Sequence, residues 1–203
     1  MKIISENDVS ATTTAVDFLR AGKIIFFATD TVYGMAADAA NERAVAQIYQ
    51  LKNRQTKKPI AIFLQNLEQA KKIFIFDEMS EKIAQKFSQN SLTLVLKKRQ
   101  EPLINLAKSL NKNDDFLGFR IVNKKFINDL LQNFGGVLAV TSANISGDAA
   151  AICADDIKKY FHFNADALLI DGGICAKKIP STVIKIDNGK VEILRQGENF
   201  IID

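Results

Sequence analysis

Residues 23–34, Lys-Ile-Ile-Phe-Phe-Ala-Thr-Asp-Thr-Val-Tyr-Gly, form a hydrophobic run that turns abruptly polar. The run Lys23–Ala28 has the length of a strand, and its apolar residues are continuous, which indicates a strand buried on both faces. Hydroxyl groups, a carboxylate and a glycine follow in Thr29–Gly34. Ligands of open α/β sheets bind beyond the ends of strands. The stretch therefore predicts an α/β sheet with a candidate site at this strand end, although Thr29–Gly34 alone is equally consistent with an ordinary turn.

Patterns typical of helices and strands alternate along the rest of the chain. Capping signals and helical spacing predict helices over 10–21, 41–51, 66–74, 78–87, 126–134 and 154–161, the first two capped by Ser10 and Asn41. Apolar runs predict strands at Ile60–Leu64, Leu92–Leu96, Leu117–Val122, Val137–Val140 and Ala167–Ile170, and a hairpin of Thr182–Ile186 with Val191–Leu194 across Asp187-Asn188-Gly189. This order indicates one α/β domain over residues 1–203 with a mixed parallel and antiparallel sheet.

The composition is that of a globular domain. The chain has 203 residues, of which 47% are hydrophobic and 25% are charged, so it can bury a core of its own. Its longest apolar runs are of strand length and too short to cross a bilayer. Acidic residues appear within the first eight positions, which is unlike a signal peptide. We therefore expect no membrane association and a cytoplasmic location.

Cysteine and histidine are scarce. Cys153 and Cys175 form no CxxC pair, so free thiols are expected. His162 is the only histidine, and a partly buried surface position is expected for it. Catalysis by a histidine triad and metal binding by protein side chains are therefore not expected.

Positive charge is concentrated in one part of the chain. The formal net charge is +4, but residues 51–100 alone contain 11 Lys/Arg against 4 Asp/Glu. The densest cluster comprises Lys52, Arg54, Lys57 and Lys58, between a predicted helix and a predicted strand. A solvated basic face is the ordinary explanation of such a run. Its place at a helix end also suits an anion site.

Four polar segments interrupt the apolar framework. They are Thr29–Gly34, Lys52–Pro59, Thr141–Gly147 and Pro180–Val183, the last leading through the hairpin to Arg195. A lysine and an arginine two positions apart can converge on one polyphosphate, the lysine as a point charge and the arginine as a bidentate fork. The hydroxyls, amide and glycine of the third segment suit a loop around a nucleotide, but ordinary loops share this composition. Neither a P-loop nor a GxGxxG pattern is present, so any nucleotide site is of another kind.

Taken together, the four segments resemble the hallmarks of the YrdC-like family, the L-threonylcarbamoyladenylate synthases. These hallmarks are a TDTVYG-type loop at Thr29–Gly34, Lys52-Asn53-Arg54 with Pro59, Ser142-Ala143-Asn144 with Ser146-Gly147, and Ser181-Thr182-Val183 with Arg195. The resemblance extends over nearly the whole chain, whose length matches the single-domain members. It implies a twisted mixed parallel/antiparallel sheet with helices packed around it and a concave basic cavity.

The resemblance also implies an activity. The family consists of nucleotidyltransferases that convert L-threonine, bicarbonate and ATP into threonylcarbamoyl-AMP and pyrophosphate, with Mg²⁺ held mostly by ATP oxygens and water. Such chemistry needs alignment and positive charge rather than a protein nucleophile. Downstream transfer proteins then move the threonylcarbamoyl group onto an adenosine beside the tRNA anticodon (t6A), so any tRNA contact of this chain is expected to be indirect.

Positions that match the family's motifs assign the site residues. The resemblance places Lys52, Arg54, Lys58, Ser142, Asn144 and Arg195 at ATP, with Lys52 and Arg54 as catalytic residues. It places Thr31, Arg120 and Ser181 at L-threonine or its carbamate, and a guanidinium suits the carboxylate of an amino acid. A surface salt bridge for Arg120 and a strand-end cap for Ser181 are the purely structural alternatives.

The chain departs from the family pattern at five positions. Ala28, Gln55 and Thr141 stand where prolines are frequent, Phe116 where a small hydroxyl residue is common, and Phe63 where some members have histidine at the amino-acid pocket. The first three concern loop rigidity. The two phenylalanines bear on how closely threonine or adenine is held.

Two other functions fit parts of the pattern. Carbamoyl-transfer modules of hydrogenase maturation share the fold, but they belong to long chains with cysteine-rich zinc elements. A non-catalytic RNA-binding or ribosome-assembly protein would use the basic 51–100 region, yet RNA readers usually add exposed aromatic residues for stacking. This chain has no tryptophan and three tyrosines.

Overall fold

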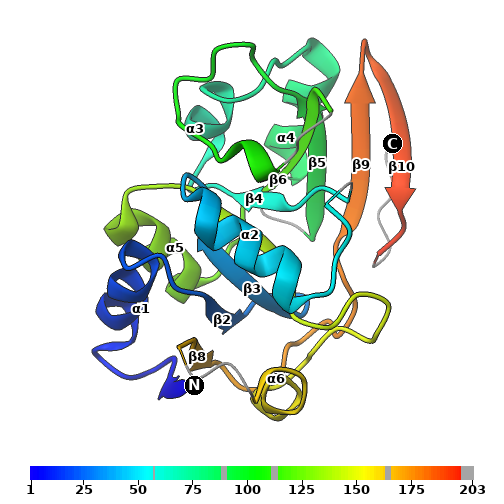
Figure 1. Ribbon diagram of the computed structural model, residues 1–203. Helices are drawn as coiled ribbons and strands as arrows, with labels where there is room; N and C mark the ends of the chain where they lie inside the picture. The colour runs from blue at the N-terminus through cyan, green and yellow to red at the C-terminus, as the bar shows by residue number, and fades with distance from the viewer. Residues whose placement is uncertain (57, 88–90, 111–113, 163–165, 198–203) are drawn as a thin grey trace.

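The computed structural model describes residues 1–203 except residues 57, 88–90, 111–113, 163–165 and 198–203, so Lys57 of the basic cluster lies outside the described residues. The described residues form one ten-stranded sheet in the order β1-β8-β2-β3-β7-β4-β6-β5-β9-β10 (Figure 1). The strands are β1 (Lys2–Ser5), β2 (Ile25–Ala28), β3 (Tyr33–Asp38), β4 (Ala61–Phe63), β5 (Leu92–Lys97), β6 (Phe116–Arg120), β7 (Leu138–Ser142), β8 (Leu168–Asp171), β9 (Thr182–Asp187) and β10 (Lys190–Arg195). The helices are α1 (Ala11–Arg20), α2 (Glu42–Leu51), α3 (Leu67–Lys71), α4 (Glu78–Phe87), α5 (Lys125–Phe134) and α6 (Ala154–Phe161), with a short 3₁₀ helix, η1, at Lys108–Leu110.

The sheet is mixed, as predicted. Strands β1 and β2 run parallel to β8, β4 runs parallel to β6, and β5 runs parallel to β9. The other neighbouring pairs are antiparallel. The terminal hairpin forms as predicted, but Asp187 pairs with Lys190, so the turn is only two residues long. Asn188 (φ 50°) and Gly189 (φ 73°) both take the positive φ that a type I′ turn requires.

Two strands were not predicted from the sequence. The segment after Ala28 was predicted to be a loop, but only 29–32 form the connection, and β3 begins at Tyr33. Glycine and alanine make up half of β3, and their low strand propensity hides a strand that is almost fully buried between β2 and β7. Strand β1 lies at the edge of the sheet and is mostly exposed, so it lacks a hydrophobic signal.

The helix starts agree with the predicted capping positions, but the two caps differ. The Oδ1 of Asn41 accepts from the backbone N–H of Ala44 at 3.0 Å, which caps α2 as predicted. Ser10 precedes α1 but its hydroxyl donates to Asp8 at 2.7 Å, so its side chain makes no cap. Helix α5 ends at Gly135 in the left-handed conformation, as predicted.

Replacing Asn41 with alanine is expected to lower the free energy of unfolding by about 1 kcal/mol, because the capped N–H then loses its acceptor. Urea denaturation at equilibrium measures this change. Asn41→Ser keeps a capping oxygen and should retain most of the stability; equal losses in the two variants would contradict the capping role.

Helices cover only part of one sheet face. Helices α1 and α5 pack together over the β2-β3-β7-β8 region, where they enclose an apolar cluster containing Ile25 and Phe27 (Figure 1). In β5, Leu92, Leu94 and Leu96 point into the core of the opposite face, while Thr93 and Val95 line a cavity. The alternation of side chains along the strands therefore leaves the β4-β6-β5-β9 part of the first face as the floor of that cavity.

The two cysteines and the histidine lie outside the four polar segments of the sequence. Cys153 and Cys175 are both free thiols, as predicted. His162 is exposed rather than partly buried. No helix within the described residues is long and apolar enough to span a membrane.

Candidate functional site

A cavity of about 660 Å³ lies on the open part of the sheet. Its wall includes residues from all four polar segments: Thr29, Thr31, Arg54, Lys58, Pro59, Thr141, Ser142, Pro180, Ser181 and Arg195. Arg120, Phe63 and Phe116 also line it, as do Asp114, Lys185 and Glu192. Cationic side chains therefore outnumber carboxylates five to two in the wall.

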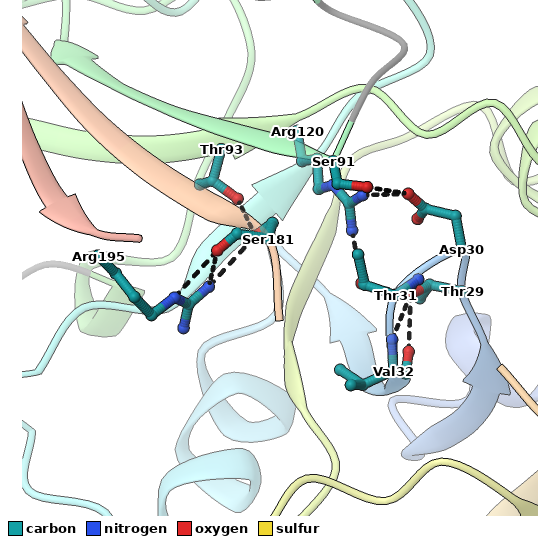
Figure 2. Close-up of polar contacts among 9 residues, drawn as sticks. All are labelled: Thr29, Asp30, Thr31, Val32, Ser91, Thr93, Arg120, Ser181 and Arg195. Atoms are coloured by element: carbon teal, nitrogen blue, oxygen red, sulfur yellow. Dashed lines mark hydrogen bonds and ion pairs between the residues drawn. The ribbon is translucent and has the colours of Figure 1, made fainter. Parts of the chain in front are cut away.

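The loop between β2 and β3 is held by its own hydroxyl groups. Thr29 Oγ1 donates to the carbonyl of Val32 at 2.6 Å and lies 2.9 Å from Thr31 Oγ1 (Figure 2). Because a hydroxyl has one proton, the Thr29–Thr31 bond takes its proton from Thr31. Thr31 Oγ1 in turn accepts from Arg120 Nη1 at 3.1 Å, which leaves it one lone pair for a ligand.

Arg120 is a buried cation at the end of β6. Its side chain is 4% exposed, and its Nη2 donates to Asp30 Oδ2 at 2.6 Å. The Ser91 hydroxyl donates to the same carboxylate oxygen at 3.1 Å (Figure 2). Burial lowers the pKa of Arg120, and the Asp30 carboxylate opposes that shift. The surface salt bridge considered from sequence is thus a buried one. Arg120 Nε is buried and has no partner among the described residues, so it remains a donor for a ligand.

Arg54 and Lys58 come from the segment that follows α2. Arg54 Nε donates to the carbonyl of Lys58 at 3.1 Å, and its Nη2 donates to the carbonyl of Pro59 at 2.9 Å. These bonds fold the segment back onto itself, so that both basic residues and Pro59 reach the cavity. The acceptors are neutral carbonyls, and no carboxylate within the described residues pairs with Arg54.

Arg195 reaches the same cavity from the last strand. Its Nε and Nη2 donate to the carbonyl of Ser181 at 3.0 and 2.8 Å, and Nη2 also lies 3.2 Å from Ser181 Oγ. Ser181 Oγ is 2.8 Å from Thr93 Oγ1 (Figure 2). Ser181 is 6% exposed. Hydrogen bonds to Thr93 on β5 and Arg195 on β10 hold its side chain in place, so it is more than a cap at the end of a strand.

The three guanidinium groups act on one another. Burial lowers the pKa of Arg195, and the positive charges of Arg120 and Arg54 lower it further. Burial also lowers the pKa of Arg54. Since arginine stays charged in proteins, this mutual repulsion marks a place where anionic oxygen atoms are stabilised.

Lys52 and Asn144 lie behind the wall instead of in it. Lys52 is 1% exposed, and its ammonium donates to the carbonyls of Ser142 and of Asn144 (2.8 Å) and to Asn144 Oδ1 at 3.1 Å. Asn144 Nδ2 donates to the carbonyls of Ile145 (2.7 Å) and Asp148 (2.9 Å). The two side chains therefore hold the 142–148 loop in shape. Burial, and secondly the charge of Arg54, lower the pKa of Lys52 to about 7.

The structure brings together most of the residues assigned from sequence. Those in the cavity wall are Thr31, Arg54, Lys58, Arg120, Ser142, Ser181 and Arg195. Sequence reasoning missed Asp30 as the partner of Arg120, and also Lys185 and Glu192, which face each other across β9 and β10. The pairing register of the predicted hairpin was the one sequence signal that could have placed Lys185 opposite Glu192. Lys185 Nζ lies 3.8 Å from the ring centroid of Phe116.

Comparisons with known proteins agree on one family. A family model for Sua5, YciO and YrdC proteins, described as telomere recombination, matches residues 17–197. A putative threonylcarbamoyl-AMP synthase of Methanocaldococcus jannaschii is 36% identical over 176 residues, covering 87% of this chain and 80% of that protein. The threonylcarbamoyl-AMP synthase of Mus musculus is 32% identical over 191 residues, covering 90% of this chain and 65% of that protein. The crystal structure of Pyrococcus abyssi Sua5 with L-threonine superposes with a TM-score of 0.87 at 28% identity, covering 97% of this chain and 57% of that chain.

The chain belongs to the Sua5/YciO/YrdC family, which confirms the resemblance found in its motifs. The match to the family model covers nearly all of the sheet and every polar segment of the cavity. The chain spans less than two thirds of the mouse protein and little more than half of the P. abyssi chain.

Proposed function

We propose that this protein is an L-threonylcarbamoyladenylate synthase, which makes threonylcarbamoyl-AMP and pyrophosphate from L-threonine, bicarbonate and ATP. The observation that carries the proposal is the convergence of Thr31, Arg120, Ser181, Arg54 and Arg195 on one cavity. The names of the relatives from M. jannaschii and Mus musculus support the same activity.

The amino acid is assigned to the Thr31–Arg120 side of the cavity. Arg120 Nε is a buried donor without a partner in the described chain, which suits a carboxylate oxygen. Thr31 Oγ1 keeps one lone pair, which suits the ammonium group on the adjacent carbon of an α-amino acid. The P. abyssi relative, whose structure holds L-threonine, supports L-threonine as the amino acid.

The phosphates are assigned to the Arg54–Arg195 side. Arg54, Lys58 and Arg195 offer donors to oxygen atoms of ATP. The Ser142 hydroxyl also lines the cavity but donates its proton to Asn144 Oδ1 at 2.7 Å, so it offers ATP the polar edge of the loop that Lys52 and Asn144 fix. The described residues contain no cluster of three or more His, Cys, Asp or Glu side chains that could hold a metal. As the family resemblance implies, Mg²⁺ would be held mostly by phosphate oxygens of ATP and by water, and it would neutralise phosphate charge.

The reaction needs positioned charges rather than a protein nucleophile. The threonine amine attacks bicarbonate, and a carbamate forms with loss of water and of one ammonium proton. A carbamate oxygen then attacks the α-phosphorus of ATP, the bond to the bridging oxygen of the β-phosphate breaks, and pyrophosphate leaves. The guanidinium groups stabilise the oxygens on which negative charge develops, and the cavity holds the two reactants in line. The adenylate would pass to transfer proteins that modify tRNA.

Pyrophosphate release tests the proposal. The protein is incubated with ATP, Mg²⁺, bicarbonate and L-threonine, each is omitted in turn, and the adduct is identified by mass spectrometry. Release that requires all four is the expected result. Release that depends on a different amine would change the substrate. Absence of both turnover and ATP binding would overturn the enzyme assignment in favour of RNA binding, which would weaken steeply with salt.

Replacing Thr31 with valine is expected to raise KM for L-threonine about tenfold, because one acceptor for the ammonium group is lost while the shape is kept. KM for ATP should change little. Steady-state pyrophosphate assays measure both constants. Thr31→Ser keeps the hydroxyl and serves as the control; an equal rise in KM for ATP would contradict the assignment of Thr31 to the amino acid.

A further inference from the structure

The two sides of the cavity differ in how their cations are compensated. On the phosphate side, Arg54 and Arg195 donate to backbone carbonyls and to the Ser181 hydroxyl, all of them neutral. Within the described part of the chain, neither arginine forms an ion pair. On the amino-acid side, Arg120 forms an ion pair of 2.6 Å with Asp30. One cavity thus contains a site of net positive charge beside a site whose charges cancel.

Asp30 acts on the cavity from behind Arg120. The residue does not belong to the cavity wall, whereas its neighbours Thr29 and Thr31 do. Its Oδ2 is bound by both Arg120 and Ser91, and Figure 2 shows Asp30 on the side of the guanidinium away from Ser181. A ligand in the cavity therefore meets the guanidinium and, behind it, the field of the carboxylate, whose Oδ1 is buried without a partner in the described chain.

We propose that Asp30 is a positioning residue that makes the amino-acid subsite electrically neutral and so reserves it for a zwitterionic α-amino acid. Anions that lack an ammonium group, such as a hydroxy acid, a phosphate or a pyrophosphate, then bind preferentially at the Arg54–Arg195 side, where no carboxylate of the described chain compensates the guanidinium groups. This inference rests on the proposed function, because it concerns the subsite that the proposal assigns to L-threonine.

Electrostatics gives the sign of the effect. A zwitterion places a carboxylate at the guanidinium and an ammonium within the field of the Asp30 carboxylate, so both of its charges are matched. An anion that lacks the ammonium group is attracted by Arg120 but repelled by the Asp30 carboxylate. Unit charges a few ångströms apart in a protein interact strongly enough to change affinity by tenfold or more. Loss of the carboxylate would therefore weaken binding of the zwitterion relative to the anion.

The test compares two ligands that differ in one group. L-Threonine and its deaminated analogue (2S,3R)-2,3-dihydroxybutanoate are titrated by calorimetry into the wild-type protein without ATP. We expect the wild type to prefer threonine by at least tenfold. Asp30→Asn, which removes the charge and keeps the shape, should reduce this preference by at least tenfold, and inorganic phosphate should then compete with threonine. If Asp30 only supported the local structure, Asp30→Asn would weaken the binding of both ligands by the same factor.

Two further variants distinguish the effect of the Asp30 charge from any structural effect of the Asp30 side chain. Asp30→Glu keeps the carboxylate and should retain most of the preference. Ser91→Ala removes a hydrogen bond to Asp30 Oδ2 but no charge, so the preference should persist even where both affinities fall. Circular dichroism reports whether each variant folds.

The outcomes distinguish this inference from the proposed function. A wild-type protein that binds no threonine under any condition would overturn the proposed function. A wild type that binds threonine and the hydroxy acid equally well would overturn the role of Asp30 alone, whether or not Asp30→Asn folds. So would an Asp30→Asn protein whose preference equals that of the wild type.

Discussion

Replacing Arg54 with alanine is expected to lower kcat/KM for ATP by about 10²-fold or more, the usual cost of removing one well-placed charged donor from such a site. Arg54 lines the cavity, and its charge is not cancelled by a carboxylate in the described chain. The substituted protein should keep its fold, since the lost bonds go to exposed carbonyls of 58 and 59. Steady-state kinetics with ATP varied, and the rise in melting temperature that ATP produces, measure the effect.

Arg43→Ala provides the matched control for Arg54. Arg43 belongs to the preceding helix, is exposed, and takes no part in the cavity wall. Its loss should leave kcat/KM for ATP within about twofold of the wild-type value, in line with the small effect of ordinary surface substitutions. Equal losses in both variants would show that helix charge in general, rather than Arg54, attracts the nucleotide.

Replacing Lys52 with methionine is expected to lower the free energy of unfolding by roughly 3 kcal/mol and to abolish most activity. Methionine fills the space but donates nothing, so the carbonyls of Ser142 and Asn144 and the Asn144 side chain lose a shared donor. A buried polar group left without a partner costs about 1–3 kcal/mol. Urea denaturation measures the stability change.

The kinetic pattern of the Lys52 variant tests how it acts. Displacement of Ser142 should raise KM for ATP as well as lower kcat, because the loop position is lost. Lys72→Met, a change at an exposed lysine after α3, is the control and should change neither stability nor rate. An unfolding free energy within about 0.5 kcal/mol of the wild-type value would refute the bracing role, since that is the range of inert surface changes.

Much of the fold could be predicted because the local signals were strong. Capping at Asn41, the Asn188-Gly189 turn and the buried run before Ala28 each depend on a few neighbouring residues. Strand β3 was missed because its small residues gain strand structure only from burial between two neighbours. The edge strand β1 was missed because it is only four residues long and mostly exposed, so neither a long apolar run nor an alternating pattern marks it.

The candidate site was predictable in its residues but not in their arrangement. The motifs identify Thr31, Arg54 and Arg195, which the structure places in one wall. Nothing local to Lys52 indicates that its ammonium turns away from the cavity to bind the 142–144 backbone, because those partners are 90 and 92 positions away. The pairing of Asp30 with Arg120 likewise spans 90 positions, so no local signal predicts it.

The parallel pairing of β5 with β9 has a consequence for synthesis on the ribosome. Strand β9 and the strand after it supply Lys185, Glu192 and Arg195 to the cavity, and Ser181 directly precedes them. While this hairpin is still inside the ribosome, the apolar edge of β5 is exposed and the wall of the cavity is incomplete. Since contacts between segments so far apart form slowly, we expect ligand binding to arise late, once the hairpin has paired with β5. Truncation before residue 181 would thus remove nucleotide binding together with the protection of β5 from aggregation.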